Sequence, residues 1–412
     1  MSRLLALVAA LAAAPARADV SWDWTEIALA SGANAKHLPF VQTRTMAMMH
    51  LAIFEAINGI DGPYRPYLQN LPATPKTAVA SVAAGREEDG RTSRAAVAAH
   101  EVLATIFPEQ KAVIDAAPEK SLAGVDAAAR DAALAEGRTI GQATLSLRAN
   151  DGSSAPNTVR PLTTPGKYVP TPLPVGSTWG SVKPWTMAKG DQFRPPPPPA
   201  LRSKQWAADC MEVAAVGGKT STTRTPQQAE AARFWAVTGP VAYMPMVHDL
   251  VSRPGRTLTQ NARLYALVSL AIADSYIAVF DAKYKYSFWR PITAIRNADQ
   301  DDNPATVRDA AWEPLIDTPM HPEYPCAHCI NSGAAQGVLE AEFGAGNIGA
   351  FRTTSPTAPG VTHTWENLAD FQAEVSNARI WGGIHYRTSA VVGTEMGRRI
   401  AKQALASVLQ PK

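Results

Sequence analysis

The sequence predicts an all-α protein with helical-bundle architecture, built from two packed bundles. Three observations lead to this class: nearly every long segment has apolar residues at helical spacing, strong helix formers dominate those segments, and alternating β-branched runs are scarce. The chain has 412 residues, 46% hydrophobic and 18% charged, which is enough apolar material for a large core. This composition excludes a disordered chain, a coiled coil and a collagen.

Residues 1–18 have the pattern of a secretory signal peptide. Arg3 precedes an apolar run from Leu4 to Ala14, and Ala16-Arg17-Ala18 is a small-x-small cleavage site. The run of about 11 residues is too short for a membrane span, which needs roughly 20. We therefore expect an exported protein, periplasmic or secreted, without a membrane span. Removing Arg3 and Arg17 lowers the formal net charge from +3 to +1, so the charge balance gives no sign of nucleic-acid binding.

Three further regions follow along the chain. Residues 19–150 are expected to form an N-terminal helical layer, with helices over 43–58, 92–107 and 124–149. Residues 151–200 are rich in Pro, Gly, Ser and Thr and end in five prolines, which is typical of an extended connection over the surface. Connections this long are often functional.

Residues 201–412 are expected to form a C-terminal helical domain that contains the functional site. A capping box marks one helix start, with Thr225 as the cap, Pro226 in the first turn and Gln228 as its partner. The other predicted helices cover residues 203–216, 258–289, 329–343, 366–381 and 390–409.

The motifs of common hydrolases, nucleotide-binding proteins and zinc proteases are absent: GxSxG, GxxxxGK[ST] and HExxH do not occur. Instead, the last third contains three clusters of ionisable residues. In the first, Lys283 and Arg290 are seven residues apart, which returns them to within about 20° of the same helical face, so two cations are expected to converge on one spot. The alternative is an ordinary solvated basic face.

The second cluster runs from His321 to His328 into a helix. Pro322 and Pro325 impose an extended entry, and the small residues that follow let a ligand approach the backbone amides at the helix start. In the third cluster, Arg379 lies at the end of a helix and His385 follows a glycine pair. For the second cluster, the alternative is an ordinary helix start with a histidine near its cap. For the third, the alternative is an arginine placed favourably at a helix C-terminus.

Together the clusters resemble the signature of the superfamily that unites vanadium-dependent haloperoxidases with type 2 phosphatidic acid phosphatases and bacterial acid phosphatases. The matching pieces are Lys283/Arg290-Pro291, Pro325-Cys326-Ala327-His328 and Arg379/His385, and flanking residues are similar to the soluble bacterial haloperoxidase-like branch. The resemblance implies an anion site in the C-terminal bundle, with vanadate as the cofactor in a peroxidase and no cofactor in a phosphatase.

The resemblance also implies a role for each site residue. Lys283, Arg290 and Arg379 would neutralise the oxyanion, with Cys326 and Ala327 in the oxyanion-binding box. His385 would bind the central atom, and is therefore the vanadium ligand if vanadate is bound, while His328 would act as acid and base. His321 occupies the position where bromide-oxidising members have histidine, next to the halide.

Several positions depart from the usual motif. Cys326 replaces a serine and Ala327 a glycine in the second piece, and Ser389 replaces the usual aspartate in the third. A thiol donates a weaker hydrogen bond than a hydroxyl, and peroxide oxidises thiols. Because the resemblance places Cys326 against the anion, we expect it to be reduced rather than joined to Cys329.

Three functions therefore remain open. The first is halide oxidation by hydrogen peroxide on a His-bound vanadate. The second is hydrolysis of a soluble phosphate ester through phospho-His385. The third is a non-catalytic protein that binds phosphate or vanadate. Each has a small-molecule partner: peroxide and halide, a phosphate ester, or the anion alone.

Overall fold

The computed structural model describes residues 19–412 except 61, 70, 72–86, 124 and 171. The predicted signal peptide lies outside these residues. The described chain is mostly helical, as predicted, and its β structure is one two-stranded antiparallel hairpin. The elements are α1 Val20–Asn34, α2 Pro39–Asn58, α4 Glu87–Ile106, α5 Lys111–Ala116, α6 Pro118–Leu122, α7 Ala127–Arg148, α8 Lys204–Val216, α9 Pro226–Phe234, α10 Pro240–Val251, α11 Leu258–Tyr286, α12 Pro291–Arg296, α13 Ala327–Phe343, β1 Asn347–Ser355, β2 Ala358–Asn367, α14 Leu368–Trp381 and α15 Arg387–Ser407.

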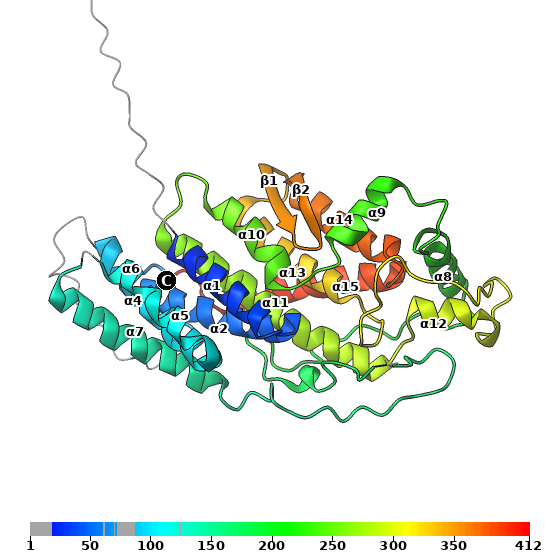
Figure 1. Ribbon diagram of the computed structural model, residues 1–412, viewed down its shortest axis with the longest axis horizontal. Coiled ribbons are helices and arrows are strands. Elements are labelled where there is room, and N and C mark those ends of the chain that lie inside the picture. Colours follow the sequence, from blue (N-terminus) through cyan, green and yellow to red (C-terminus); the bar gives the residue numbers. More distant parts are fainter. Residues whose placement is uncertain (1–18, 61, 70, 72–86, 124, 171) are drawn as a thin grey trace, which may run out of the picture.

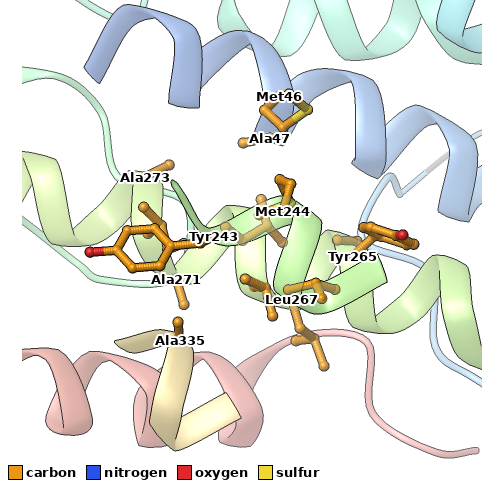
Figure 2. Close-up of a cluster of buried hydrophobic side chains, with 14 of the residues drawn as sticks. Met46, Ala47, Tyr243, Met244, Tyr265, Leu267, Ala271, Ala273 and Ala335 are labelled. Carbon is orange, nitrogen blue, oxygen red and sulfur yellow. The ribbon is translucent and has the colours of Figure 1, made fainter. Parts of the chain in front are cut away.

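The long helix α11 lies between the N-terminal and C-terminal helices (Figure 1). It packs against α2 on one side and against α13 and α15 on another. Figure 2 shows Met46 and Ala47 of α2 on one side of this core and Ala335 of α13 on the opposite side, next to Ala271 of α11. Small residues at these positions let the helices approach closely. One core therefore joins both halves of the chain.

Capping explains several of the helix starts. The predicted capping box at α9 is confirmed. The Thr225 side chain accepts a hydrogen bond from the Gln228 backbone amide, and the Gln228 side chain accepts one from the Thr225 backbone amide. Thr257 and Gln260 form the same arrangement at α11. Among the described helices, α11 alone is long and apolar enough to cross a membrane. However, 94% of its most apolar stretch is buried inside the protein.

One local prediction was wrong, and one element was missed. The helix predicted over 258–289 ends at Tyr286, because Ser287 adopts a left-handed conformation with φ 48° and the chain then pairs with the connection, where Trp289 N–H donates to Gly166 O. The hairpin β1–β2 was not predicted. It carries Phe351 and Trp365 opposite each other, and both side chains are buried against Phe371 of α14.

The proline-rich connection runs from α7 to α8 along the lower edge of Figure 1. It is extended over 155–163 and 194–200 and forms turns and bends over much of the stretch between them, with one short 3-10 turn at Trp179–Ser181. Asp274 of α11 fixes its middle by accepting hydrogen bonds from the amides of Trp185, Thr186 and Met187. The connection is thus an ordered wall that packs along α11.

Candidate active site

The first predicted pair meets at the C-terminal end of α11, although not on one helical face. Lys283 is in the last turn of α11, is fully buried, and donates to Pro322 O at 2.9 Å and Glu323 O at 2.7 Å. Arg290 lies beyond the helix end, as the N-cap of α12, and donates to the carbonyls of His321 and Ile384. The two cations are therefore brought together by their contacts with the second and third motifs. The helical repeat does not do this, because Arg290 lies outside α11.

The second motif forms the start of α13. Cys326 is the N-cap, and its Sγ accepts from the Cys329 amide at 3.2 Å. The prediction of a reduced Cys326 needs correction, because the structure joins it to Cys329 in a disulfide. The first helical turn places the two Cα atoms 5.3 Å apart, within the range that a disulfide spans. Ala327 and His328 follow on the side of the cavity described below.

The third motif brings its two residues to the same place from different elements. Arg379 is buried in the last turn of α14, where it donates to Trp235 O. His385 is buried in the short link to α15, as expected. Gly383, with φ +79°, permits this tight link because a side chain there would collide with the backbone of Gly217.

Glu323 is a site residue that sequence reasoning missed. Its Oε1 accepts from His385 Nδ1 at 2.7 Å and from the Tyr386 amide at 3.2 Å, and its side chain is fully buried. This carboxylate fixes the ring orientation of His385 and leaves Nε2 on the other side, 3.3 Å from an Arg290 nitrogen. The signal was present in the sequence: Ser389 lacks the carboxylate usual in the third motif, and Glu323 lies inside the second.

A cavity of about 560 Å³ opens onto these groups. Its inner wall includes His321, Ala327, His328, Arg379 and His385. Lys283 and Arg290 do not line the cavity themselves. Arg290 lies directly behind His321, whose Nδ1 is 3.0 Å from an Arg290 nitrogen. Cys326 is likewise buried behind this wall.

Burial controls the electrostatics of the site. It lowers the pKa of Arg379 to about 9 and that of Arg290 to about 10. Burial, followed by the nearby cations, also lowers the pKa values of His328 and His385 well below 6.5, so both rings are neutral at pH 7. The site thus combines buried positive charge with neutral imidazoles.

The residues present fit a tetrahedral oxyanion such as vanadate or phosphate. Among the described residues, Lys283, Arg290 and Arg379 form no ion pair with a carboxylate within 4.0 Å, although burial makes isolated cations costly. His328 Nε2 and Arg379 Nε are buried without a hydrogen-bond partner in the same part of the chain. An anion in the cavity would supply the missing charge and acceptors.

Comparisons with known proteins agree with this arrangement. Residues 263–411 match the family model of the VCPO second helical-bundle domain. Vanadium chloroperoxidase of Curvularia inaequalis is 27% identical over 189 residues, which are 39% of this chain and 31% of that protein. The chain therefore spans about a third of the length of this curated relative.

Solved structures extend the likeness to the whole fold. A bacterial vanadium-dependent iodoperoxidase has a TM-score of 0.77 at 23% identity, with 95% of this chain and 96% of that chain covered. An apo-type bacterial vanadium-dependent chloroperoxidase has a TM-score of 0.70 at 15% identity, with coverage of 89% and 92%. The family model and the curated relative therefore support the vanadium haloperoxidase superfamily for the C-terminal part of the chain, and the solved structures show that almost the whole chain shares their fold.

Proposed function

We propose that the protein is an exported vanadium-dependent haloperoxidase that acts in the periplasm or outside the cell. The observation that carries the proposal is the buried, unpaired positive charge around His385, whose Nδ1 is held by Glu323. The N-terminal pattern supports export, and the bacterial iodoperoxidase with the same fold supports the reaction class.

His385 would hold vanadate through Nε2, with Lys283, Arg290 and Arg379 balancing its negative charge. When bound, vanadate supplies a Lewis acid that activates hydrogen peroxide without changing its own oxidation state. In the net reaction the halide gives two electrons to peroxide, the O–O bond breaks, and hypohalous acid and water form with the uptake of one proton.

His328 is the group that moves protons in this proposal. Its ring is neutral at pH 7 and its Nε2 has no partner among the described residues, so it can accept a proton from incoming peroxide. It returns the proton to the oxygen that leaves as water. His321 lies against Arg290 on the same wall and would contact the halide.

Phosphate ester hydrolysis is the second candidate, and the bond between Glu323 and His385 favours it. A carboxylate on Nδ1 raises the nucleophilicity of Nε2, which is the atom that would attack phosphorus. Replacement of the usual Ser-Gly by Cys326 and Ala327 supports the third candidate, an anion-binding protein without turnover.

The test is to load the purified protein with orthovanadate, remove free anion, and measure bound vanadium by elemental analysis. Bromide and iodide oxidation by peroxide are measured on the same sample, with phosphate-loaded protein as the control. We expect stoichiometric vanadium and halide oxidation only after vanadate loading. Hydrolysis of a soluble phosphate ester that vanadate inhibits, without halide oxidation, would establish the phosphatase instead. Anion binding with neither activity would establish the binding protein.

A further inference from the structure

The cavity at the active site is much larger than an oxyanion, and its outer part is apolar. Its volume of about 560 Å³ lies in the range of pockets that hold organic ligands. Arg379, His328 and His385 are buried polar members of its lining, each 6% exposed or less. Most of the other lining residues are apolar, among them Leu38, Phe40, Val175, Phe280, Ile316 and Met320, and Thr238 and Asp317 are polar exceptions.

This apolar wall is assembled from four distant segments that are fixed to one another. Val175 of the proline-rich connection donates its N–H to Met320 O and accepts from the Tyr284 hydroxyl. Gly176 lets the connection lie against Phe280, since an added Cβ would come within 2.5 Å of that ring. The Phe40 ring in turn packs at 5.0 Å on Phe280. The pocket is thus preformed.

The apolar and polar parts of the pocket adjoin each other. His321 packs edge-on against Phe280 at 5.4 Å, so the apolar wall continues directly into the polar end. Leu38 and Met320, which also line the cavity, are 38% and 39% exposed, so these two side chains lie where the cavity meets the solvent. An apolar molecule that enters would present one end to His385 and Arg379.

We propose that this pocket binds an apolar aromatic molecule, which accepts the oxidised halogen before it escapes into solution. The inference rests on the proposed haloperoxidase function. In the transfer, an arene carbon forms a bond to the halogen of hypohalous acid and loses its hydrogen as a proton. The hydroxide part of hypohalous acid leaves with that proton as water. Phe40, Tyr276 and Phe280 suit an aromatic body because they offer ring faces and edges for packing.

Binding is tested first without peroxide, by equilibrium dialysis of 2-naphthol against the vanadate-loaded protein. Met320→Asp places a charge in the apolar wall and should weaken binding at least about tenfold. Leu38→Asp should do the same, and it is a variant that will fold, because Leu38 is the N-cap of α2 and aspartate is a preferred N-cap residue. Leu173→Asp is the matched control, since Leu173 is 83% exposed in the same connection and does not line the pocket.

Transfer inside the pocket is tested with bromide and peroxide in the presence of excess taurine, which traps free hypobromous acid. Taurine is added at a concentration that stops the bromination of 2-naphthol by reagent hypobromous acid. We expect the wild type still to brominate 2-naphthol under these conditions, and the Met320→Asp variant not to do so. Non-saturable naphthol binding, or equal binding by both rim variants and the wild type, would overturn the pocket. Saturable binding with full taurine suppression would overturn the transfer step. A lack of bromide oxidation altogether would refute the proposed function and with it the acceptor role, whatever the dialysis shows.

Discussion

His50 and His328 are both buried histidines in this protein, but their surroundings differ. His50 has a partner on each ring nitrogen: Thr25 Oγ1 lies 2.8 Å from Nε2, and Ser269 Oγ lies 2.7 Å from Nδ1. His328 Nε2 has no partner among the described residues and faces the cavity. The fully bonded group ties α1, α2 and α11 together. The nitrogen of His328 without a partner is where the proposed anion would complete the hydrogen bonding.

The same contrast holds for the charged groups along α11. Asp274, in the middle of the helix, satisfies its carboxylate with three backbone amides and the Thr186 hydroxyl. At the far end, Lys283 donates to two carbonyl oxygens and, among the described residues, has no carboxylate within 4.0 Å, while burial lowers its pKa well below the ordinary value. In these two comparisons all four groups are buried, and what differs is how completely each one is paired.

The largest effect is expected from His385→Ala. If His385 holds vanadate as proposed, removing the imidazole takes away the one side chain proposed to ligate vanadium, so activity should vanish and bound vanadium should fall to background, while the far-UV circular dichroism stays unchanged. His100→Ala is the control, because His100 pairs with Asp115 near the surface and lies far along the chain from the site. Stoichiometric vanadium in His385→Ala would show that another residue is the ligand.

His328→Ala should lower turnover by about 10²- to 10⁴-fold, the usual cost of losing a general acid and base. The anion should still bind, since Lys283, Arg290, Arg379 and His385 remain. Turnover and bound vanadium are therefore measured on the same preparation. If vanadium binding disappears together with activity, His328 is part of the anion cradle.

Glu323→Gln should lower vanadate affinity or turnover by about 10- to 100-fold, as expected for a partner that orients a ligating histidine. The amide has nearly the same shape but no charge, so the fold should persist. The ¹⁵N chemical shifts of His385 should change toward a mixture of tautomers, an effect that a purely structural role would not produce. Glu212→Gln, which breaks the more exposed pair with Arg387, is the control. Unchanged His385 shifts in Glu323→Gln would contradict the positioning role.

The smallest effect concerns protein stability. It tests His50, the buried histidine whose two ring nitrogens both have hydrogen-bond partners. Burial lowers the pKa of His50 to about 3, whereas in the unfolded chain it is near 6.5. As pH falls from 6.5 toward 4.5, the unfolded state takes up a proton that the native state does not, so native stability declines. His50→Gln should lose about 2 kcal/mol less over this interval than the wild type. Urea unfolding at the two pH values measures the difference, and equal losses would show that His50 is protonated in the native state.

Much of this arrangement was predictable from the sequence. The helical class, the capping box at Thr225 and the position of His385 just after a helix follow from local patterns, which do not depend on tertiary contacts. The meeting of Lys283 and Arg290 was predicted for the wrong reason. Periodicity extended the helix to Trp289, but pairing with the proline-rich connection ends it at Tyr286.

The remaining features depend on contacts between distant segments. Glu323 reaches His385 across 62 residues, and Val175 reaches Met320 across a longer interval still. The hairpin β1–β2 forms because Phe351 and Trp365 find an aromatic neighbour in α14. Helix and turn patterns do not reveal such partners, and for Glu323 the signal was the missing carboxylate at Ser389. The disulfide between Cys326 and Cys329 was open from spacing alone, and the resemblance favoured the wrong alternative.

The position of α11 limits how this protein can be shortened. The matched family domain begins at residue 263, inside α11, so a fragment cut there would lose the capped start of the helix and every contact with α2. Such a fragment would expose an apolar helix that is long enough to insert into a lipid bilayer. Expression of the fragment that begins at residue 263 should therefore give aggregates or membrane-associated material. Engineering of the site needs the whole chain from α1 onward.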